Sequence, residues 1–190
     1  MERPDPNEYA PYYERYISLV PEDDIAGALA AQPDEIGSLL GDVPEEKGTY
    51  AYADGKWTIK ELLSHLIDGE RIFSYRALRI SRGDKTPIEG FEQDDYIENS
   101  NANNRTFADL LEEFTLERQA NLRLFNNISE EGSKRIGTAS DNPVSARAIV
   151  WIMAGHVRHH IGVLKERYLQ DRFKNKAGET SPTPSPPFSA

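Results

Sequence analysis

The sequence predicts an all-α protein, built as an antiparallel four-helix bundle, from three observations. Four long segments carry apolar residues at the three- to four-residue spacing of an amphipathic helix. Helix-capping or helix-breaking residues bound these segments, and no segment alternates strongly between apolar and polar residues as a half-buried strand does. A chain of 190 residues, 38% hydrophobic and 28% charged, is large enough for one globular domain and has little room for a second.

The first two helices are expected at residues 22–40 and from residue 59 to near Gly83. Pro33 lies inside the first and is expected to kink or divide it. Thr58 and Glu61 form a capping box at the start of the second, in which each side chain satisfies the other residue's backbone N–H. The apolar stripes of the two helices are Ile25, Leu29, Ile36, Leu39 and Leu40, then Leu62, Leu63, Leu66, Ile72, Phe73 and Leu78.

The third and fourth helices have clear starting signals as well. Thr106 and Ser145 are residues that favour N-cap positions, and an apolar periodicity follows each of them. The fourth helix is expected to end near Gln170. The inner faces are Leu110, Leu111, Phe114, Leu122 and Phe125, then Ile149, Ile152, Met153, His156, His160, Val163 and Leu164.

The connections divide the chain into a folded domain and a tail. Residues 83–104 form a long polar loop between the second and third helices, and loops of this length are often functional. Such a crossover would let the two helices lie non-adjacently and could cover one mouth of a central site. The tyrosine-rich stretch at residues 12–16 is expected to pack on the bundle. Residues 1–172 are therefore the predicted domain, and the Pro/Ser-rich residues 173–190 a disordered tail.

Composition excludes several classes of function. The formal charge of −10, with no basic stripe, argues against a nucleic-acid partner, because phosphate binding relies on clustered Lys and Arg. The chain has no cysteine, which leaves histidine and carboxylate as metal ligands. The N-terminus has no apolar signal region, and no apolar run approaches 18 residues. We therefore expect a cytoplasmic protein without a membrane partner.

Three of the four histidines lie in the fourth predicted helix. His156 and His160 are four residues apart, so both imidazoles leave one face of a helix one turn apart. His65, on the second helix, is the histidine left to complete a three-nitrogen metal site. A lone histidine on an apolar face is more often a hydrogen-bonded core residue. Burying three imidazoles without a metal, however, would leave several ring nitrogens to satisfy, which favours the ligand interpretation.

Two further residues are candidates for supporting roles around these ligands. His159 sits about 60° to one side of the His156 stripe, so it is expected to be a neighbour of the ligands or part of an interface rather than a ligand. Asp68 could accept the outer N–H of a ligating imidazole or bind a metal-bound water, and a solvated surface carboxylate is the equal alternative. No H-E-x-x-H, G-x-S-x-G, Walker loop or G-x-G-x-x-G occurs, so no helix-borne general base lies between His156 and His160.

At this point the motifs resemble those of a known family. Residues 56–68, KWTIKELLSHLID, are similar to the W-[ST]-x-x-E-x-x-x-H-L-x-D signature of the DinB-like superfamily, and residues 155–160, GHVRHH, resemble its last-helix G-H-x-x-H-H. The likeness covers roughly residues 17–168 and includes further landmarks at Asp84, Gly90-Phe91 and Phe114-x-x-x-Arg118. The resemblance implies a four-helix bundle, often homodimeric, with one divalent metal held by His65, His156 and His160; zinc or nickel is the expected ion.

The resemblance also suggests a reaction without fixing it. Characterised relatives include thiol-dependent transferases and isomerases that use bacillithiol or mycothiol. A protein without cysteine must import its sulfur nucleophile, and a metal with three neutral ligands favours thiolate over thiol. A thiol S-transferase acting on a small molecule is therefore the first expectation. A metal-dependent hydrolase is the second, and a non-enzymatic stress-response or binding module with a structural metal site is the third.

Overall fold

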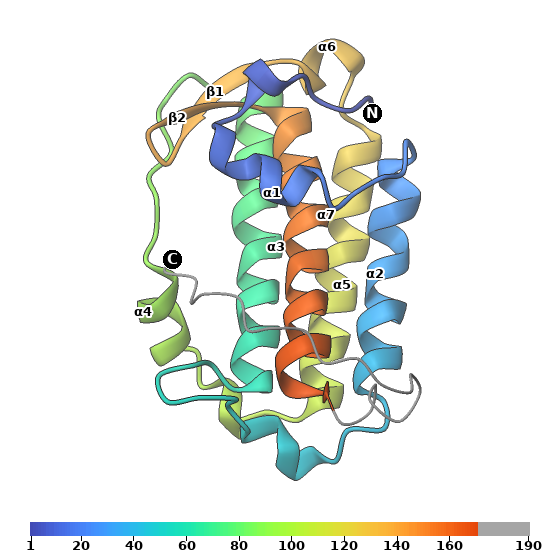
Figure 1. The fold of residues 1–190 in the computed structure, drawn as a ribbon. Helices are drawn as coiled ribbons and strands as arrows, with labels where there is room; N and C mark the ends of the chain where they lie inside the picture. Colours follow the sequence, from blue (N-terminus) through green and yellow to red (C-terminus); the bar gives the residue numbers. More distant parts are fainter. Residues whose placement is uncertain (171–190) are drawn as a thin grey trace.

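Four long helices form the centre of the molecule in the computed structural model, which describes residues 1–170 (Figure 1). They are α2 (Ile25–Leu40), α3 (Ile59–Ser81), α5 (Phe107–Asn126) and α7 (Ala146–Val163), the last extended by a π-helical turn (Leu164–Tyr168). Both α2 and α3 pack against α5 and α7, which places the four in a ring. The predicted four-helix bundle is confirmed.

The connection between α3 and α5 determines the direction of the helices. In Figure 1, α2 and α7 run down the bundle and α3 and α5 run up it. The α2–α5 and α3–α7 neighbours are therefore antiparallel, whereas α3 and α5 are parallel. The long connection would allow the second and third helices to lie apart, but α3 and α5 pack directly on each other. The connection instead returns the chain to the end at which α3 began, and it contains a short helix, α4 (Gln93–Glu98), that packs on α3.

The helix starts follow local capping chemistry. Thr58 accepts a hydrogen bond from the backbone N–H of Glu61, whose carboxylate accepts from the backbone N–H of Thr58. Thr106 and Ser145 each accept from the N–H three residues on, at the starts of α5 and α7. Asp24 does the same for α2. Side-chain caps of this kind satisfy backbone donors that a helix cannot satisfy itself. The three predicted N-caps are confirmed.

Pro33 does not divide α2, which is continuous through it. Proline lacks an N–H, so the carbonyl one turn earlier, that of Leu29, receives no hydrogen bond from within the helix. Arg118 of α5 donates to this carbonyl through Nη1 over 2.8 Å. The helix tolerates its proline because a buried side chain of the neighbouring helix supplies the missing donor.

A buried polar layer crosses the bundle at this level. Arg118 forms a two-pronged ion pair with Glu70 of α3 (Nε–Oε2 2.9 Å, Nη2–Oε1 2.6 Å) and donates to Gln32 of α2 over 2.6 Å. Gln32 in turn donates to the carbonyl of Ala154 in α7 over 2.7 Å. The layer thus ties all four helices together, and the apolar core lies on both sides of it as two separate clusters.

A two-stranded hairpin, which the sequence did not predict, closes one end of the bundle. β1 (Ile136–Ala139) and β2 (Asn142–Ser145) follow a short helix, α6 (Glu130–Ser133), and pair antiparallel. The two residues of the turn, Ser140 and Asp141, have φ values of 48° and 60°, and Ile88 of the α3–α5 connection bridges to Ala139. Strands of four residues are too short to give a clear alternating pattern.

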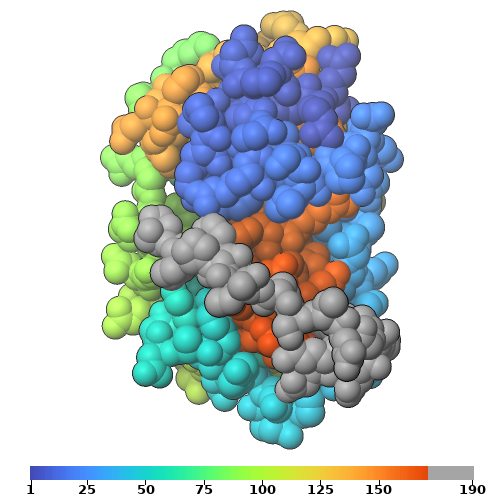
Figure 2. Space-filling view, viewed as in Figure 1, coloured from blue at the N-terminus to red at the C-terminus, as the bar shows by residue number. Residues whose placement is uncertain are grey.

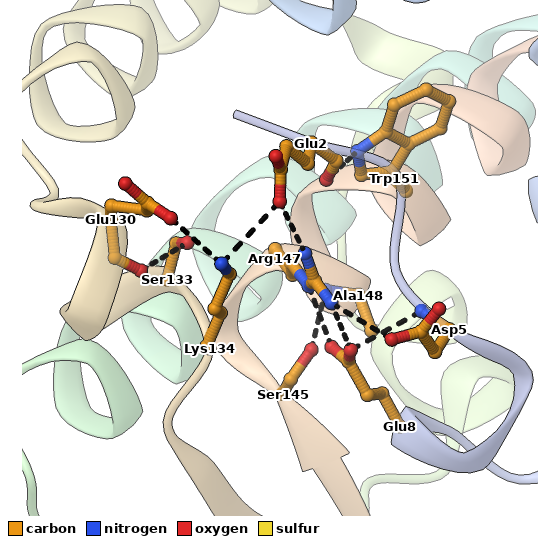
Figure 3. A network of polar contacts seen from close by, with 10 residues as sticks. All are labelled: Glu2, Asp5, Glu8, Glu130, Ser133, Lys134, Ser145, Arg147, Ala148 and Trp151. Atoms are coloured by element: carbon orange, nitrogen blue, oxygen red, sulfur yellow. Dashed lines mark hydrogen bonds and ion pairs between the residues drawn. The ribbon is translucent and has the colours of Figure 1, made fainter.

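The N-terminal segment crosses the outside of α7, where it covers the upper front face of the molecule (Figure 2). α1 (Glu14–Ile17) packs on α7, as expected for the tyrosine-rich stretch. Arg147 of α7 forms ion pairs with Glu8 and, over 3.3 Å, with Glu2, whose backbone carbonyl accepts from Trp151 Nε1 over 3.1 Å (Figure 3). These contacts hold residues 2–8 on the first two turns of α7.

Two remaining expectations concern a membrane-spanning helix and the C-terminal tail. Among residues 1–170, no helix has the length and apolar character needed to cross a membrane. The predicted tail at residues 173–190 lies outside the described residues, as does the end of the predicted domain at residue 172.

Candidate metal centre

The three histidines singled out by the sequence meet between α3 and α7. His65 comes from α3, and His156 and His160 come from successive turns of α7. Nε2 of His156 lies 2.9 Å from Nε2 of His65 and 3.1 Å from Nε2 of His160. One possible ligand atom from each residue lies within 4.8 Å of the others. His65 and His156 are buried, whereas His160 is partly exposed.

Two glycines lie where neighbouring segments pack around His156. Gly69, one turn after His65 on α3, faces His156; a Cβ there would lie 3.5 Å from Cε1 of the imidazole, an ordinary van der Waals contact. Gly155 faces the N-terminal segment, and a Cβ at this position would overlap the backbone carbonyl of Tyr16. α1 therefore crosses α7 at the turn that carries His156. Tyr16 consequently lies beside this imidazole, with the two ring centroids 5.6 Å apart.

Burial keeps the three imidazoles neutral. Desolvation, with a smaller contribution from His159, lowers the pKa of His65 from its usual value of 6.5 to about 4. Desolvation also lowers the pKa of His156 and of His160 well below 6.5, and the neighbouring imidazoles add to the effect. Neutral imidazole is the form that binds a metal, because the coordinating nitrogen must offer a free lone pair.

The geometry fits a divalent cation. In a tetrahedral site with metal–nitrogen distances of roughly 2.0–2.1 Å, ligand nitrogens lie about 3.3 Å apart, close to the Nε2 separations of 2.9 and 3.1 Å in this structure. Each neutral imidazole carries a single N–H, so a cation at the centre would use the three converging lone pairs and leave the proton on Nδ1. Nitrogen ligands without thiolates suit zinc, nickel, copper or cobalt.

Aromatic side chains surround the histidines and orient their rings. Nδ1 of both His65 and His160 is buried and has no hydrogen-bond partner among the described residues. Their orientation therefore comes from packing. The ring of Trp57 lies 4.7 Å from that of His65, and the ring of Phe73 lies 5.6 Å from that of His156. Trp57, Phe73 and Tyr16 are all partly exposed, so this aromatic collar borders both the histidines and solvent.

His159 stays outside the cluster. It is half-buried, and its ring contacts those of His160 and Tyr16 at centroid distances of 5.1 and 5.6 Å. Burial is the main cause of its lowered pKa. A supporting role next to the ligands stays a prediction, and so does participation in an interface.

Asp68 points to a different part of the molecule. It lines a pocket of about 570 Å³ between α3, α4 and α5, together with Arg71 and Glu113, and none of the three clustered histidines lines that pocket. No hydrogen bond joins Asp68 to His65, whose Nδ1 has no partner. Burial raises the pKa of Asp68. The expected bond to an outer imidazole N–H is therefore not formed here, and a contact through water stays a prediction.

Comparison with known proteins agrees with the motifs and the fold. The family model of the DinB superfamily matches residues 28–164. The chain belongs to the DinB superfamily. Among solved structures, YfiT from Bacillus subtilis, described as a probable metal-dependent hydrolase with an unusual four-helix bundle topology, matches with a TM-score of 0.71 at 15% sequence identity. The match covers 90% of this chain and 94% of YfiT, and at this identity it shows a shared fold. No curated protein matches the chain.

Some residues at the site were not apparent from the sequence. Tyr16 lies before the matched region, and sequence reasoning gave it only a packing role. Phe73 was placed on the apolar stripe of its helix, although its ring contacts His156. Gly69, one turn after His65, was a usable signal, since a glycine inside a long helix often marks a close approach.

Proposed function

We propose that this DinB-superfamily protein is a metal-dependent S-transferase, which activates a low-molecular-weight thiol at His65, His156 and His160 and joins its sulfur to a small electrophile. The observation that carries the proposal is the convergence of three neutral, largely buried imidazole nitrogens in a chain without cysteine. A divalent cation with three uncharged ligands keeps its full charge and lowers the pKa of a thiol that reaches it.

The residues of the chain would hold the ion and shape the space around it. The imidazoles supply ligands that stay neutral well below pH 7, while the aromatic collar limits the access of water to the reacting sulfur. An exogenous ligand would approach the centre past His160, the partly exposed member of the three. No glutamate lies between His156 and His160 to act as a helix-borne base. Activation therefore falls to the metal rather than to a side chain of this turn.

Hydrolysis is the second candidate, favoured by the likeness to a solved structure described as a probable metal-dependent hydrolase. The same centre would lower the pKa of a water. In either case we propose a small-molecule substrate, zinc or nickel as the ion, and a homodimer.

The two candidates separate by their cosubstrate. Metal-loaded protein is incubated with bacillithiol, mycothiol or glutathione plus monochlorobimane, and in parallel with ester and amide panels without thiol. The transferase proposal expects turnover that requires the thiol and disappears in His160→Ala. The matched variant His159→Ala should keep its metal and lose activity only in part. Undiminished hydrolysis without thiol would favour the hydrolase, and turnover that is insensitive to His160→Ala would remove the metal from the reaction.

A further inference from the structure

One buried cationic side chain of this protein lacks the anionic partner that the others have. The cationic side chains buried among residues 1–170 are Lys60, Arg76, Arg118 and Arg147. Burying a charge is costly unless an opposite charge and hydrogen bonds compensate it. Three of the four satisfy this requirement through carboxylates, in the pairs Lys60–Glu45, Arg118–Glu70 and Arg147–Glu8.

Arg76 of α3 is the exception. It is 5% exposed and forms no ion pair within the described residues. Its Nη2 donates to the backbone carbonyl of Glu89 over 3.1 Å and to Oγ of Ser140 over 3.0 Å, and both acceptors are neutral. Desolvation lowers the pKa of Arg76, opposed only by the phenol of Tyr13, yet a guanidinium stays protonated in proteins. Arg76 therefore carries a buried positive charge, and its guanidinium has further N–H groups that can donate hydrogen bonds.

The position of Arg76 relates it to the histidine cluster. It lies eleven residues after His65, which on an α-helix is three turns plus about 20°, so the two residues share a face of α3. Gly69, which contacts His156, lies seven residues before Arg76, or about 10 Å along the axis. Phe73 lies between these two levels, and its ring contacts His156.

The N-terminal segment borders the same face. Tyr16 lies against His156, and Tyr13 is close enough to Arg76 for the guanidinium to act on the pKa of its phenol, which burial raises. Both tyrosines and Phe73 are partly exposed. Partly exposed aromatic side chains thus lie beside the histidine cluster, where they are Tyr16 and Phe73, and near the unpaired guanidinium, where it is Tyr13.

We propose that Arg76 binds the carboxylate or phosphate group of the small molecule that reacts at the histidine cluster. The inference rests on the proposed function and narrows its substrate class to anionic small molecules. A guanidinium matches a carboxylate or phosphate with paired N–H donors, and a bound anion would compensate the buried charge.

The first test measures anion binding without requiring turnover. The Nε–Hε resonance of Arg76, assigned by through-bond correlation to its own backbone, is followed in the metal-loaded full chain during titration with succinate, inorganic phosphate or neutral succinamide. The matched control is Arg79→Gln on the same helix, because Arg79 already has a carboxylate partner in Asp84 at 2.6 Å. We expect the anions to cause a saturable shift of this resonance and a higher melting temperature in the wild type and in Arg79→Gln, and to leave the melting temperature of Arg76→Gln unchanged.

The result that would overturn the inference is the absence of a saturable shift, or an equal rise in melting temperature in Arg76→Gln. The wild-type titration decides the question even if Arg76→Gln folds poorly. The anion that saturates at lower concentration identifies the preferred group.

The second test connects Arg76 to the reaction. In the thiol-transfer assay, Arg76→Gln should raise KM about tenfold or more, as expected for losing a charge-assisted hydrogen bond, with metal content unchanged and kcat within about twofold. If the anions bind at Arg76 but Arg76→Gln has the same KM as the wild type, the link between Arg76 and the histidine cluster is overturned. If no thiol supports turnover, the proposed function fails, while the titration still decides whether Arg76 is an anion site.

Discussion

Acidification of the metal-free protein should destabilise it through the histidine cluster. The pKa of His65 is about 4 in the folded chain, whereas an unfolded histidine has a pKa near 6.5. Below pH 6.5 the unfolded chain therefore binds more protons than the folded one. Stability falls as the pH drops through 6.5, and the loss continues until the folded pKa near 4 is reached.

The size of the effect follows from the two pKa values. Between pH 7.5 and pH 5.0, His65 alone should cost about 2 kcal/mol of unfolding free energy. His156 and His160 have lowered pKa values as well, so each adds a loss of the same sign. Carboxylates contribute little in this window. Glu8, for example, whose pKa is lowered to about 2, loses its stabilising effect only as the pH falls below its unfolded value.

Urea denaturation of chelator-treated protein at the two pH values measures this loss, with His65→Leu as the matched variant. The wild type should lose about 2 kcal/mol more than the variant over this range. Equal losses would refute the reasoning, because they would show that His65 titrates alike in the folded and unfolded states.

The same burial makes protons poor competitors for the folded site, so we expect bound metal to persist at pH 5.5, well below the pKa of a free imidazole.

Three further results are expected. Elemental analysis should find about one divalent ion per chain, lost in His65→Ala and in His160→Ala; full retention in both would exclude the cluster as the site. Glu70→Gln should lower the free energy of unfolding by about 3–5 kcal/mol in urea denaturation, because it leaves a buried guanidinium unpaired. The surface variant Glu117→Gln should lower it by at most about 1 kcal/mol. Similar losses in the two variants would contradict the burial argument. Gly155→Ala should cost about 1–3 kcal/mol, since its Cβ overlaps an α1 carbonyl; an unchanged melting temperature would show that α1 moves freely.

The sequence predicted those features that depend on neighbouring residues. The caps at Thr58, Thr106 and Ser145 act over three residues, and the four-residue spacing of His156 and His160 puts both side chains on one helix face. The apolar periodicity then orients that face toward the other helices. Such signals were enough for the four helices, their starting points and the three clustered histidines.

Features that depend on distant partners were not predictable in this way. The carbonyl of Leu29, which Pro33 leaves without a donor, is satisfied by Arg118, 89 positions later, and no local pattern pairs them. Arg76 looks like an ordinary polar residue of an amphipathic helix until Glu89 and Ser140 of remote segments pack on it. Burial by remote segments decides the chemistry of both. The hairpin is a local feature that was missed for another reason, because its two strands of four residues each are too short to give a clear alternating pattern.

The packing of the N-terminal segment on α7 affects how this protein can be shortened. A chain cut to the family match would begin at residue 28 and lack every residue that crosses α7. Arg147 would lose its carboxylate partners, and the indole of Trp151 would lose its hydrogen-bond acceptor. His156 would lose its ring contact with Tyr16. A minimal domain drawn from family boundaries would therefore be a weaker fold with an altered histidine cluster, and activity measured on it would describe a different molecule.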